Sequence, residues 1–313
     1  MSEVDNGGAI AIKGFNYQKA AIIFVIIHHF EKPNFKIVPE SKDDFEVYLD
    51  GQVYYIQVKG TKKLSIAKLK SKPKGKESII EKNLSPGTDN DNRKIFLWDL
   101  AETTKSELTK VRGTLVPEKY QFSDNQKTDF IETLGLNSSQ LLRLENQFVY
   151  VTPFTNDLEK ALIMLKGYMV EKELLVTNER ASIVLSELAL EIDQKSEILI
   201  DVEDDFLNKE IDGNYLKKIF TTVKQKEMFD EVLNNLNLNT RMKEKVRAIK
   251  LRIPLLHITL KEKIKDRIIT NEVMNCNTDE EAINYIRSLI RESIEVELSI
   301  ALAIDCFCEI EEV

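Results

Sequence analysis

Residues 44–59 constrain the fold more than any other part of this chain. They read DFEVYLDGQVYYIQVK, two segments of alternating character joined by Asp50 and Gly51. Asp-Gly between alternating segments is the strongest local signal for a two-residue β-hairpin turn, and such a turn fixes which residues face each other. The sequence therefore predicts an antiparallel hairpin in which Leu49 pairs with Gln52.

The predicted register gathers polar side chains on one face of the hairpin. Counting outward from the turn places Asp44 opposite Gln57 and leaves Lys59 diagonally beside Asp44. It also places Glu46 opposite Tyr55. The other face carries apolar side chains that can pack on a core, namely Phe45, Val47, Leu49, Ile56 and Val58.

The polar face offers the ligands that a hard divalent cation prefers. The Asp44 carboxylate, the Gln57 side-chain oxygen and the Val58 carbonyl can bind Mg²⁺, and Glu46 is a further carboxylate. Lys59 can stabilise an attacking hydroxide or the charge that develops on a phosphate. The hairpin therefore predicts metal-dependent phosphodiester chemistry. The alternative is a half-buried hairpin with a solvated polar face.

These residues resemble a known nuclease family. The segment Gln57-Val58-Lys59 resembles the active-site strand of PD-(D/E)xK, restriction-endonuclease-like nucleases in which glutamine replaces the second acid. Residues 14–18 at the start of a helix, and Glu40 just ahead of residues 43–44, are similar to the nuclease domain of CD-NTase-associated, Cap-four type double-strand DNA endonucleases. The same domain occurs in Lamassu-like anti-phage systems. The resemblance covers residues 1–200.

The resemblance implies an Mg²⁺-dependent endodeoxyribonuclease, with Mn²⁺ as an alternative metal. It implies low sequence specificity and a role as the effector of a bacterial anti-phage system, controlled by assembly or by a partner. It also implies that Asp44, Gln57 and Lys59 are catalytic and that Glu40 and Gln18 support them. At the start of its helix, Gln18 is equally well explained as a capping or surface residue.

The identity of the essential carboxylate stays open at this point. Because Gln57 is neutral, Asp44 or Glu46 must carry the metal. Asp43 is a third candidate. Strand parity places Asp43 on the apolar side of the hairpin and so favours Asp44.

A run of lysines follows the proposed site. Residues 59–76 contain eight lysines and no acidic residue, although the whole chain has a net charge of -8. Such a run predicts a sequence-independent contact with the backbone of double-stranded DNA. The alternative is a solvated surface segment. The seven lysines after Lys59 are Lys62, Lys63, Lys68, Lys70, Lys72, Lys74 and Lys76.

Composition excludes several other classes of function. Three histidines and three cysteines are too few for paired-histidine nucleases or zinc hydrolases, and they make a Ser-His-Asp triad improbable. No uninterrupted apolar run reaches the ~18 residues of a membrane span, and the first residues carry no basic secretory signal. We therefore expect a cytoplasmic protein that does not contact membranes.

Periodicity predicts an α/β fold with two domains. Strands are expected over residues 38–48, 53–59, 95–98 and 148–151, helices over 16–30 and 157–169, and a loop over 71–93. These elements form a restriction-endonuclease-like mixed sheet flanked by helices in domain 1–200. An all-helical domain, 201–313, follows, with helices expected over 256–273 and 278–294.

The helical domain carries no catalytic motif. We expect it to serve oligomerisation, partner binding or regulation. The expected partners are a second copy of the chain or a regulatory subunit, such as an SMC-like ATPase or a sensor.

Two other functions compete with the nuclease. One is a catalytically inactive nuclease fold that acts as a DNA-binding or scaffold subunit of a larger defence complex, which the neutral Gln57 favours. The other is a helical interaction protein whose hairpin is purely structural.

Overall fold

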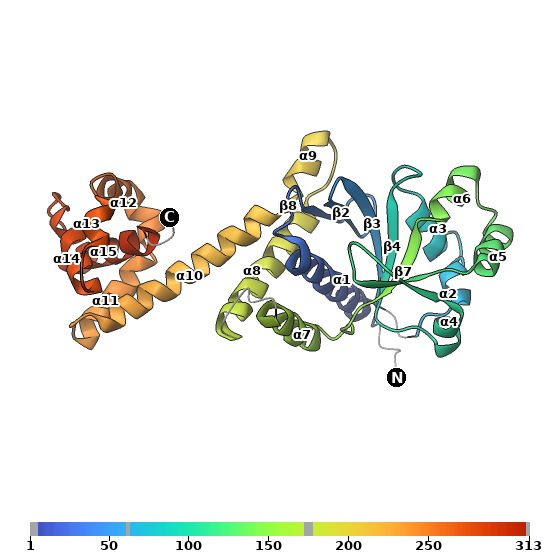
Figure 1. Cartoon of the computed structure of the whole chain (residues 1–313), viewed down its shortest axis with the longest axis horizontal. Helices are drawn as coiled ribbons and strands as arrows, with labels where there is room; N and C mark the ends of the chain where they lie inside the picture. The colour runs from blue at the N-terminus through green and yellow to red at the C-terminus, as the bar shows by residue number, and fades with distance from the viewer. Residues whose placement is uncertain (1–5, 61–62, 172–177, 311–313) are drawn as a thin grey trace. The chain divides into compact units, whose positions relative to one another are not determined.

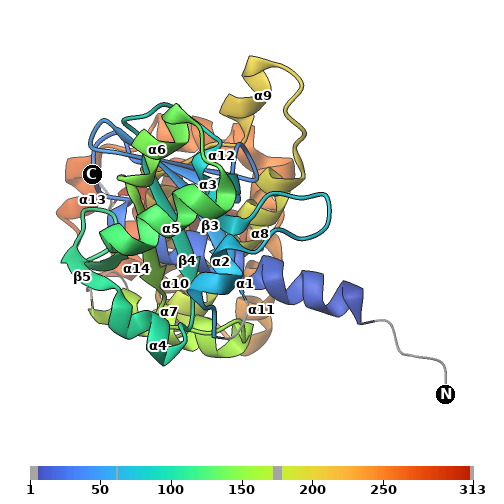
Figure 2. The same ribbon diagram turned by 90° about the vertical axis from the view of Figure 1, so that its right-hand side faces the viewer.

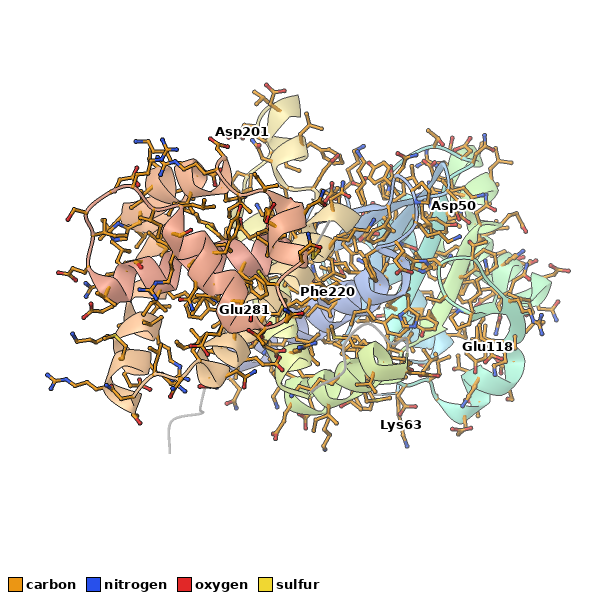
Figure 3. The ribbon with its side chains drawn as sticks, turned by 60° about the vertical axis from the view of Figure 1, so that its left-hand side comes forward. Asp50, Lys63, Glu118, Asp201, Phe220 and Glu281 are labelled. Atoms are coloured by element: carbon orange, nitrogen blue, oxygen red, sulfur yellow. The ribbon has the colours of Figure 1, made fainter. Side chains whose placement is uncertain are left out.

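The predicted hairpin forms with the expected register. Strands β2 (Phe45–Leu49) and β3 (Gln52–Lys59) are antiparallel and pair residue for residue as the sequence predicts. Asp50 and Gly51 have φ values of 50° and 74°. Positive φ at both central positions is what a tight hairpin turn of this twist requires. Asp50 marks the tip of the hairpin (Figure 3).

Residues 38–48, predicted as one strand, form two. Strand β1 (Lys36–Pro39) pairs antiparallel with β2, and residues 40–44 turn between them. Glu40 has a φ of 47°, which takes the backbone out of the extended region. The prediction was wrong here because strand alternation was read through the polar residues 41–43. Asp44 lies at the end of this turn, next to the start of β2.

The structure is a computed structural model that describes residues 6–60, 63–171 and 178–310. The remaining strands within these ranges are β4 (Asn92–Leu97), β5 (Thr109–Arg112), β6 (Glu118–Gln121), β7 (Gln147–Val151) and β8 (Ile211–Asp212). One mixed sheet contains all eight, in the order β5-β6-β7-β4-β3-β2-β1-β8. The pairs β3–β4 and β4–β7 are parallel and the others antiparallel. The predicted α/β fold with a mixed sheet is confirmed.

Helices cover both faces of this sheet (Figure 1). One face is covered by α1 (Gly7–His29), α7 (Leu158–Glu171) and α8 (Asn178–Glu197). The other is covered by α2 (Ile66–Lys70), α3 (Ile79–Leu84), α5 (Asp124–Leu134) and α6 (Ser138–Leu144), whose apolar side chains form a core with β4 and β7. Two further short helices are α4 (Glu102–Glu107) and α9 (Glu203–Asn208).

Residues 71–93, predicted as a loop, contain α3. A capping box starts this helix: the Ser78 hydroxyl accepts from the Glu81 backbone N–H, and the Glu81 carboxylate accepts from the Ser78 N–H. Ile80 and Leu84 are buried in the core. The surrounding proline and glycine residues favoured a loop, and the Ser-x-x-Glu signal was missed. Helix α3 packs on β3 and β4.

Helix α1 begins earlier than predicted, at Gly7 rather than at residue 16. Residues 6–14 are exposed, and this end of the helix extends away from the sheet (Figure 2). Among the described residues, α1 is the one helix long and apolar enough to cross a membrane. Residues 17–27 are nevertheless buried, and α1 packs against β1, β3, α7 and α8. Burial inside the protein therefore accounts for the apolar character of α1.

The chain divides into two compact units, Met1–Ile219 and Phe220–Val313. The predicted boundary after residue 200 falls inside the first unit, because β8 pairs with β1. In its described residues the second unit is helical, as predicted. Its helices are the C-terminal part of α10 (Gly213–Asn235), α11 (Thr240–Lys250), η1 (Ile253–His257), α12 (Ile258–Lys265), α13 (Thr270–Met274), α14 (Asp279–Ser288) and α15 (Val296–Ile310).

Two predicted C-terminal helices are shorter than expected. Residues 256–273 are divided between η1, α12 and α13, and α14 ends at Ser288 rather than continuing to residue 294. The apolar periodicity continues past both ends because the following residues still pack on the core of the second unit: Ile268, Ile290 and Ile294 contact it from outside α12 and α14.

Candidate active site

Asp44 is held in place by three hydrogen bonds, from β3, from α1 and from the turn between β1 and β2. Its Oδ2 atom accepts from the Val58 N–H of β3 at 2.7 Å. Its carbonyl accepts from Gln18 Nε2 of α1 at 2.8 Å and from the Glu40 N–H at 2.9 Å. Because these hydrogen bonds hold both the main chain and the side chain of Asp44, its carboxylate lies in one position beside the C-terminal end of β3.

Lys59, the last residue of β3, lies beside this carboxylate as predicted. Its Nζ atom is 3.8 Å from Asp44 Oδ2, and its side chain is 26% exposed. Burial lowers the pKa of Lys59, and the neighbouring Asp44 charge opposes this shift. A lysine with this balance donates a proton more readily than one in water, while staying next to its carboxylate.

Gln57, two residues before Lys59 in β3, lies beneath the surface at the same site. Its side chain is fully buried. With the carboxamide oriented so that both of its ends are satisfied, Nε2 donates to the Ile79 carbonyl at 2.9 Å and Oε1 accepts from Lys82 Nζ at 3.1 Å. The polar face of the hairpin is therefore covered by α3, which contradicts the alternative of a solvated face.

Lys82 is a member of the site that the sequence analysis missed. Its Nζ atom lies 3.3 Å from Asp44 Oδ1, so it bridges Asp44 and Gln57. Burial opposes protonation, but the neighbouring Asp44 and Asp43 carboxylates raise the pKa of Lys82 above its ordinary value. Had the Ser78 capping box been recognised, it would have predicted a helix at this point, with Lys82 one turn inside it.

Gln18 and Glu40 join the same network. Gln18 Nε2 donates to Glu40 Oε1 at 2.7 Å as well as to the Asp44 carbonyl. The first turn of the buried part of α1 is thereby tied to the turn between β1 and β2. The structure thus brings together all five predicted catalytic residues, and it places Gln18 and Glu40 behind the Asp44 backbone, where they position it.

The Asp43 carboxylate has different hydrogen-bond partners from the Asp44 carboxylate. Its carboxylate accepts from Asn83 Nδ2 of α3 at 2.7 Å and from the Asp44 N–H at 3.0 Å. Burial, with a smaller contribution from the Asp44 charge, raises the pKa of Asp43 to about 6. Asn83 also donates to the Tyr55 carbonyl, so this pair connects α3 to β3.

Glu46, the other candidate metal ligand, has a different set of partners. Its carboxylate accepts from Ser41 Oγ at 2.8 Å, from the Lys42 N–H at 3.2 Å and from Tyr48 OH at 2.9 Å. The side chain is fully buried. These contacts brace the turn that carries Asp44. The geometry therefore gives Glu46 a structural task, and its predicted role as a metal ligand is not supported by these contacts.

The lysines that follow Lys59 divide into two groups. Lys70 pairs with Asp129 at 2.5 Å, and Lys72 pairs with Glu81 at 2.6 Å, so their charges are compensated within the fold. Lys62 lies outside the described residues. The other four are exposed and form no ion pair within the described part of the chain: Lys63, Lys68, Lys74 and Lys76.

The site can be reached from solvent on the side of its lysines. The Lys82 side chain is 50% exposed and that of Asp44 is 16% exposed. No group of three or more His, Cys, Asp or Glu side chains that could hold a metal occurs within residues 6–60, 63–171 and 178–310. A metal here would rest on few protein ligands, which is the usual arrangement for Mg²⁺ at phosphate-processing sites.

The mixed sheet, with Asp44, Gln57 and Lys59 together at the end of β3, defines a restriction-endonuclease-like nuclease fold. A family model described as "Cap4, dsDNA endonuclease domain" matches residues 6–134. The Lamassu protein LmuA of a Bacillus species is 60% identical over 316 aligned positions, which cover 100% of both chains. No solved structure gives a significant match. The chain therefore belongs to the family of the Lamassu protein LmuA, and its first part matches the Cap4 endonuclease domain.

Proposed function

We propose that this protein is a Mg²⁺-dependent DNA endonuclease and the effector of an anti-phage defence system. One observation carries the proposal: Asp44 Oδ1 and Gln57 Oε1 both lie within hydrogen-bond distance of a single cationic group, while Lys59 lies next to the other Asp44 oxygen. Two hard oxygen ligands and a lysine at the end of one strand suit phosphodiester hydrolysis.

The proposed metal ligands are Asp44 Oδ1, Gln57 Oε1 and the Val58 carbonyl. Mg²⁺ is usually bound by one or two carboxylates, with water and substrate phosphates completing its shell, so a single carboxylate is sufficient. The bound ion would activate a water molecule and neutralise phosphate charge; Mn²⁺ has similar preferences. The Val58 N–H has a separate role: it binds Asp44 Oδ2, so Oδ1 is the carboxylate oxygen that would bind the ion.

Lys59 is proposed to stabilise the negative charge that develops on the scissile phosphate. Its ammonium is held at the site by Asp44, and partial burial strengthens its interaction with an incoming anion because fewer water molecules screen it. The four exposed lysines Lys63, Lys68, Lys74 and Lys76 are proposed to contact DNA phosphates. Contacts of this kind carry no sequence information, which accounts for the proposed low sequence specificity.

Substitution of the central residues tests this function. We expect Lys59→Met and Asp44→Asn each to reduce Mg²⁺-dependent cleavage of plasmid DNA at least about 100-fold, because each removes a charge at the reacting phosphate. EDTA should have the same effect on the unsubstituted protein. Lys105→Met, an exposed lysine of α4, is the matched control and should cleave normally.

The measurement is plasmid nicking and linearisation over a range of protein concentrations, with circular dichroism to confirm folding. A folded Lys59→Met protein that cleaves at the normal rate would refute the assignment. We propose that cleavage is controlled by self-assembly or by a regulatory subunit, such as an SMC-like ATPase or a sensor. The assay is therefore run at several protein concentrations. The C-terminal unit is the proposed site of that control.

A second candidate function is a catalytically inactive DNA-binding or scaffold subunit. The observation that favours it is Lys82, whose ammonium lies where the proposed ion would bind. This function predicts salt-sensitive DNA binding with no cleavage in Mg²⁺ or Mn²⁺ at any protein concentration. The same plasmid assay therefore separates the two functions.

A further inference from the structure

Lys82 reaches the active site from α3, the helix that covers the polar face of β3. Its Nζ atom lies 3.3 Å from Asp44 Oδ1 and 3.1 Å from Gln57 Oε1. The other Asp44 oxygen already accepts from the Val58 N–H and lies beside Lys59. The two oxygen atoms proposed to bind a metal are therefore the same two that contact Lys82.

The backbone that carries Lys82 is fixed, whereas its side chain has room to move. The capping box at Ser78 and Glu81 holds the start of α3, and Ile80 and Leu84 anchor the helix in the core. The Lys82 side chain is 50% exposed. Its flexible four-carbon stem can swing the ammonium into solvent without any change in α3.

We propose that Lys82 is a built-in counter-cation that occupies the metal position of the free protein and competes with the metal for Asp44 and Gln57. The inference rests on the proposed function. A divalent ion and an ammonium cannot share the two oxygens, because their charges repel and the ion requires closer approach. Metal entry therefore requires Lys82 to leave.

This competition links DNA binding to metal binding. When Lys82 leaves Asp44, its ammonium loses its carboxylate partner and needs another anion, and a DNA phosphate at the site supplies one. DNA should consequently strengthen metal binding to the unsubstituted protein. In the absence of DNA, Lys82 should keep metal occupancy low.

Metal binding to the full-length protein without DNA tests the proposal. Mn²⁺ is the probe, followed by its electron paramagnetic resonance signal and by isothermal titration calorimetry. We expect Lys82→Met to bind Mn²⁺ at least about tenfold more tightly than the unsubstituted protein, because it removes a competing charge about 3 Å from both ligands. A non-cleavable DNA duplex should strengthen Mn²⁺ binding to the unsubstituted protein more than to the variant.

Lys42→Met is the matched control. Lys42 lies two residues before Asp44 and is exposed, but its ammonium lies over the Phe206 ring rather than at the carboxylate. Its removal changes the net charge equally, and we expect Mn²⁺ affinity to change by less than about twofold, because exposed charges are screened. Lys82→Gln, which is neutral and polar, replaces Lys82→Met if the methionine variant does not fold.

The outcomes separate this inference from the function on which it rests. If Asp44→Asn abolishes Mn²⁺ binding while Lys82→Met leaves it unchanged or weaker, Lys82 does not compete, and the proposed metal site stands. If neither the unsubstituted protein nor Lys82→Met binds Mn²⁺ at millimolar concentration, both the inference and the metal-dependent function fall. An equal gain in the Lys42→Met control would also overturn the inference, because the effect would then be one of general charge.

Discussion

Lys94 is a lysine that is buried in the interior of the first unit. It lies in the middle of β4, fully buried, with its Nζ atom over the rings of Tyr54 and Phe148 and without a hydrogen-bond partner in the described part of the chain. Burial, with a further contribution from the Lys119 charge, lowers the pKa of Lys94 well below its ordinary value. An unpaired buried amine of this kind reduces the stability of the fold.

We expect Lys94→Met to stabilise the protein by about 1–3 kcal/mol, because it replaces an unsatisfied polar group with an apolar one of similar length. Unfolding followed by circular dichroism in denaturant measures this change. An exposed control, Lys105→Met, should alter the free energy of unfolding by less than about 0.5 kcal/mol. A Lys94→Met protein that is less stable than the unsubstituted one would show that the amine has a partner essential to the fold.

The same residue predicts a pH dependence. Between the lowered pKa of Lys94 in the folded protein and its unfolded pKa of about 10.5, the unfolded chain binds a proton that the folded protein does not, so stability rises with pH across this window. Lys94→Met should remove this dependence. Free energies of unfolding at pH 7 and 9.5 measure it, and an unchanged slope between these values in the variant would contradict the assigned direction.

At the scale of elements, the lysine segment after β3 has one part that the fold uses and one part that it leaves exposed. Lys70 and Lys72 pair with acidic residues, whereas Lys63, Lys68, Lys74 and Lys76 do not among the residues described. Lys63 is labelled in Figure 3. The exposed group is therefore the part of the segment that is available to phosphates.

Replacing these four lysines by glutamine should weaken double-stranded DNA binding about tenfold or more at low salt. It should also reduce the dependence of affinity on salt by roughly 0.9 logarithmic unit for each phosphate that is no longer neutralised. Fluorescence anisotropy over a salt series measures both quantities. Glutamine at Lys32, Lys105, Lys110 and Lys160, also exposed and in the first unit, removes the same charge and should have a smaller effect. Equal reductions in affinity in the two variants would mean that only net charge matters.

The helices and strands differ in how well the sequence predicted them, and the β2–β3 hairpin and α3 show why. The register of the β2–β3 hairpin was predicted correctly to the residue because adjacent side chains and the Asp-Gly turn determine it locally. Helix α3 was missed because it is short and lies between residues that favour loops. Burial of Ile80 and Leu84 stabilises this helix more than local propensity does. Lys82 and Asn83 were missed with it.

At the scale of the whole molecule, the two units have separate cores. Ile95 is buried in a cluster of the first unit, and Ile286 is buried in the cluster of the second. Units with their own cores can unfold in separate transitions. We therefore expect a destabilising substitution in one core to leave the unfolding transition of the other unit unchanged.

We expect Ile286→Ala to lower the stability of the second unit by about 2–5 kcal/mol, because it leaves a cavity in that core. The transition assigned to the first unit should keep its midpoint. Differential scanning calorimetry measures both, and Ile95→Ala is the reciprocal variant, expected to shift only the other transition. A single transition that moves with either substitution would show that the units unfold together.

The sequence by itself determined the hairpin, its register, the fold class and the residues that resemble a nuclease site. These follow from local turn chemistry and from alternation along the chain. Only the tertiary structure decided which distant groups meet Asp44: Gln18 comes from 26 positions away and Lys82 from 38. Their positions depend on how α1 and α3 pack on β3, and packing is set by buried surfaces far apart in the chain, which no local pattern records.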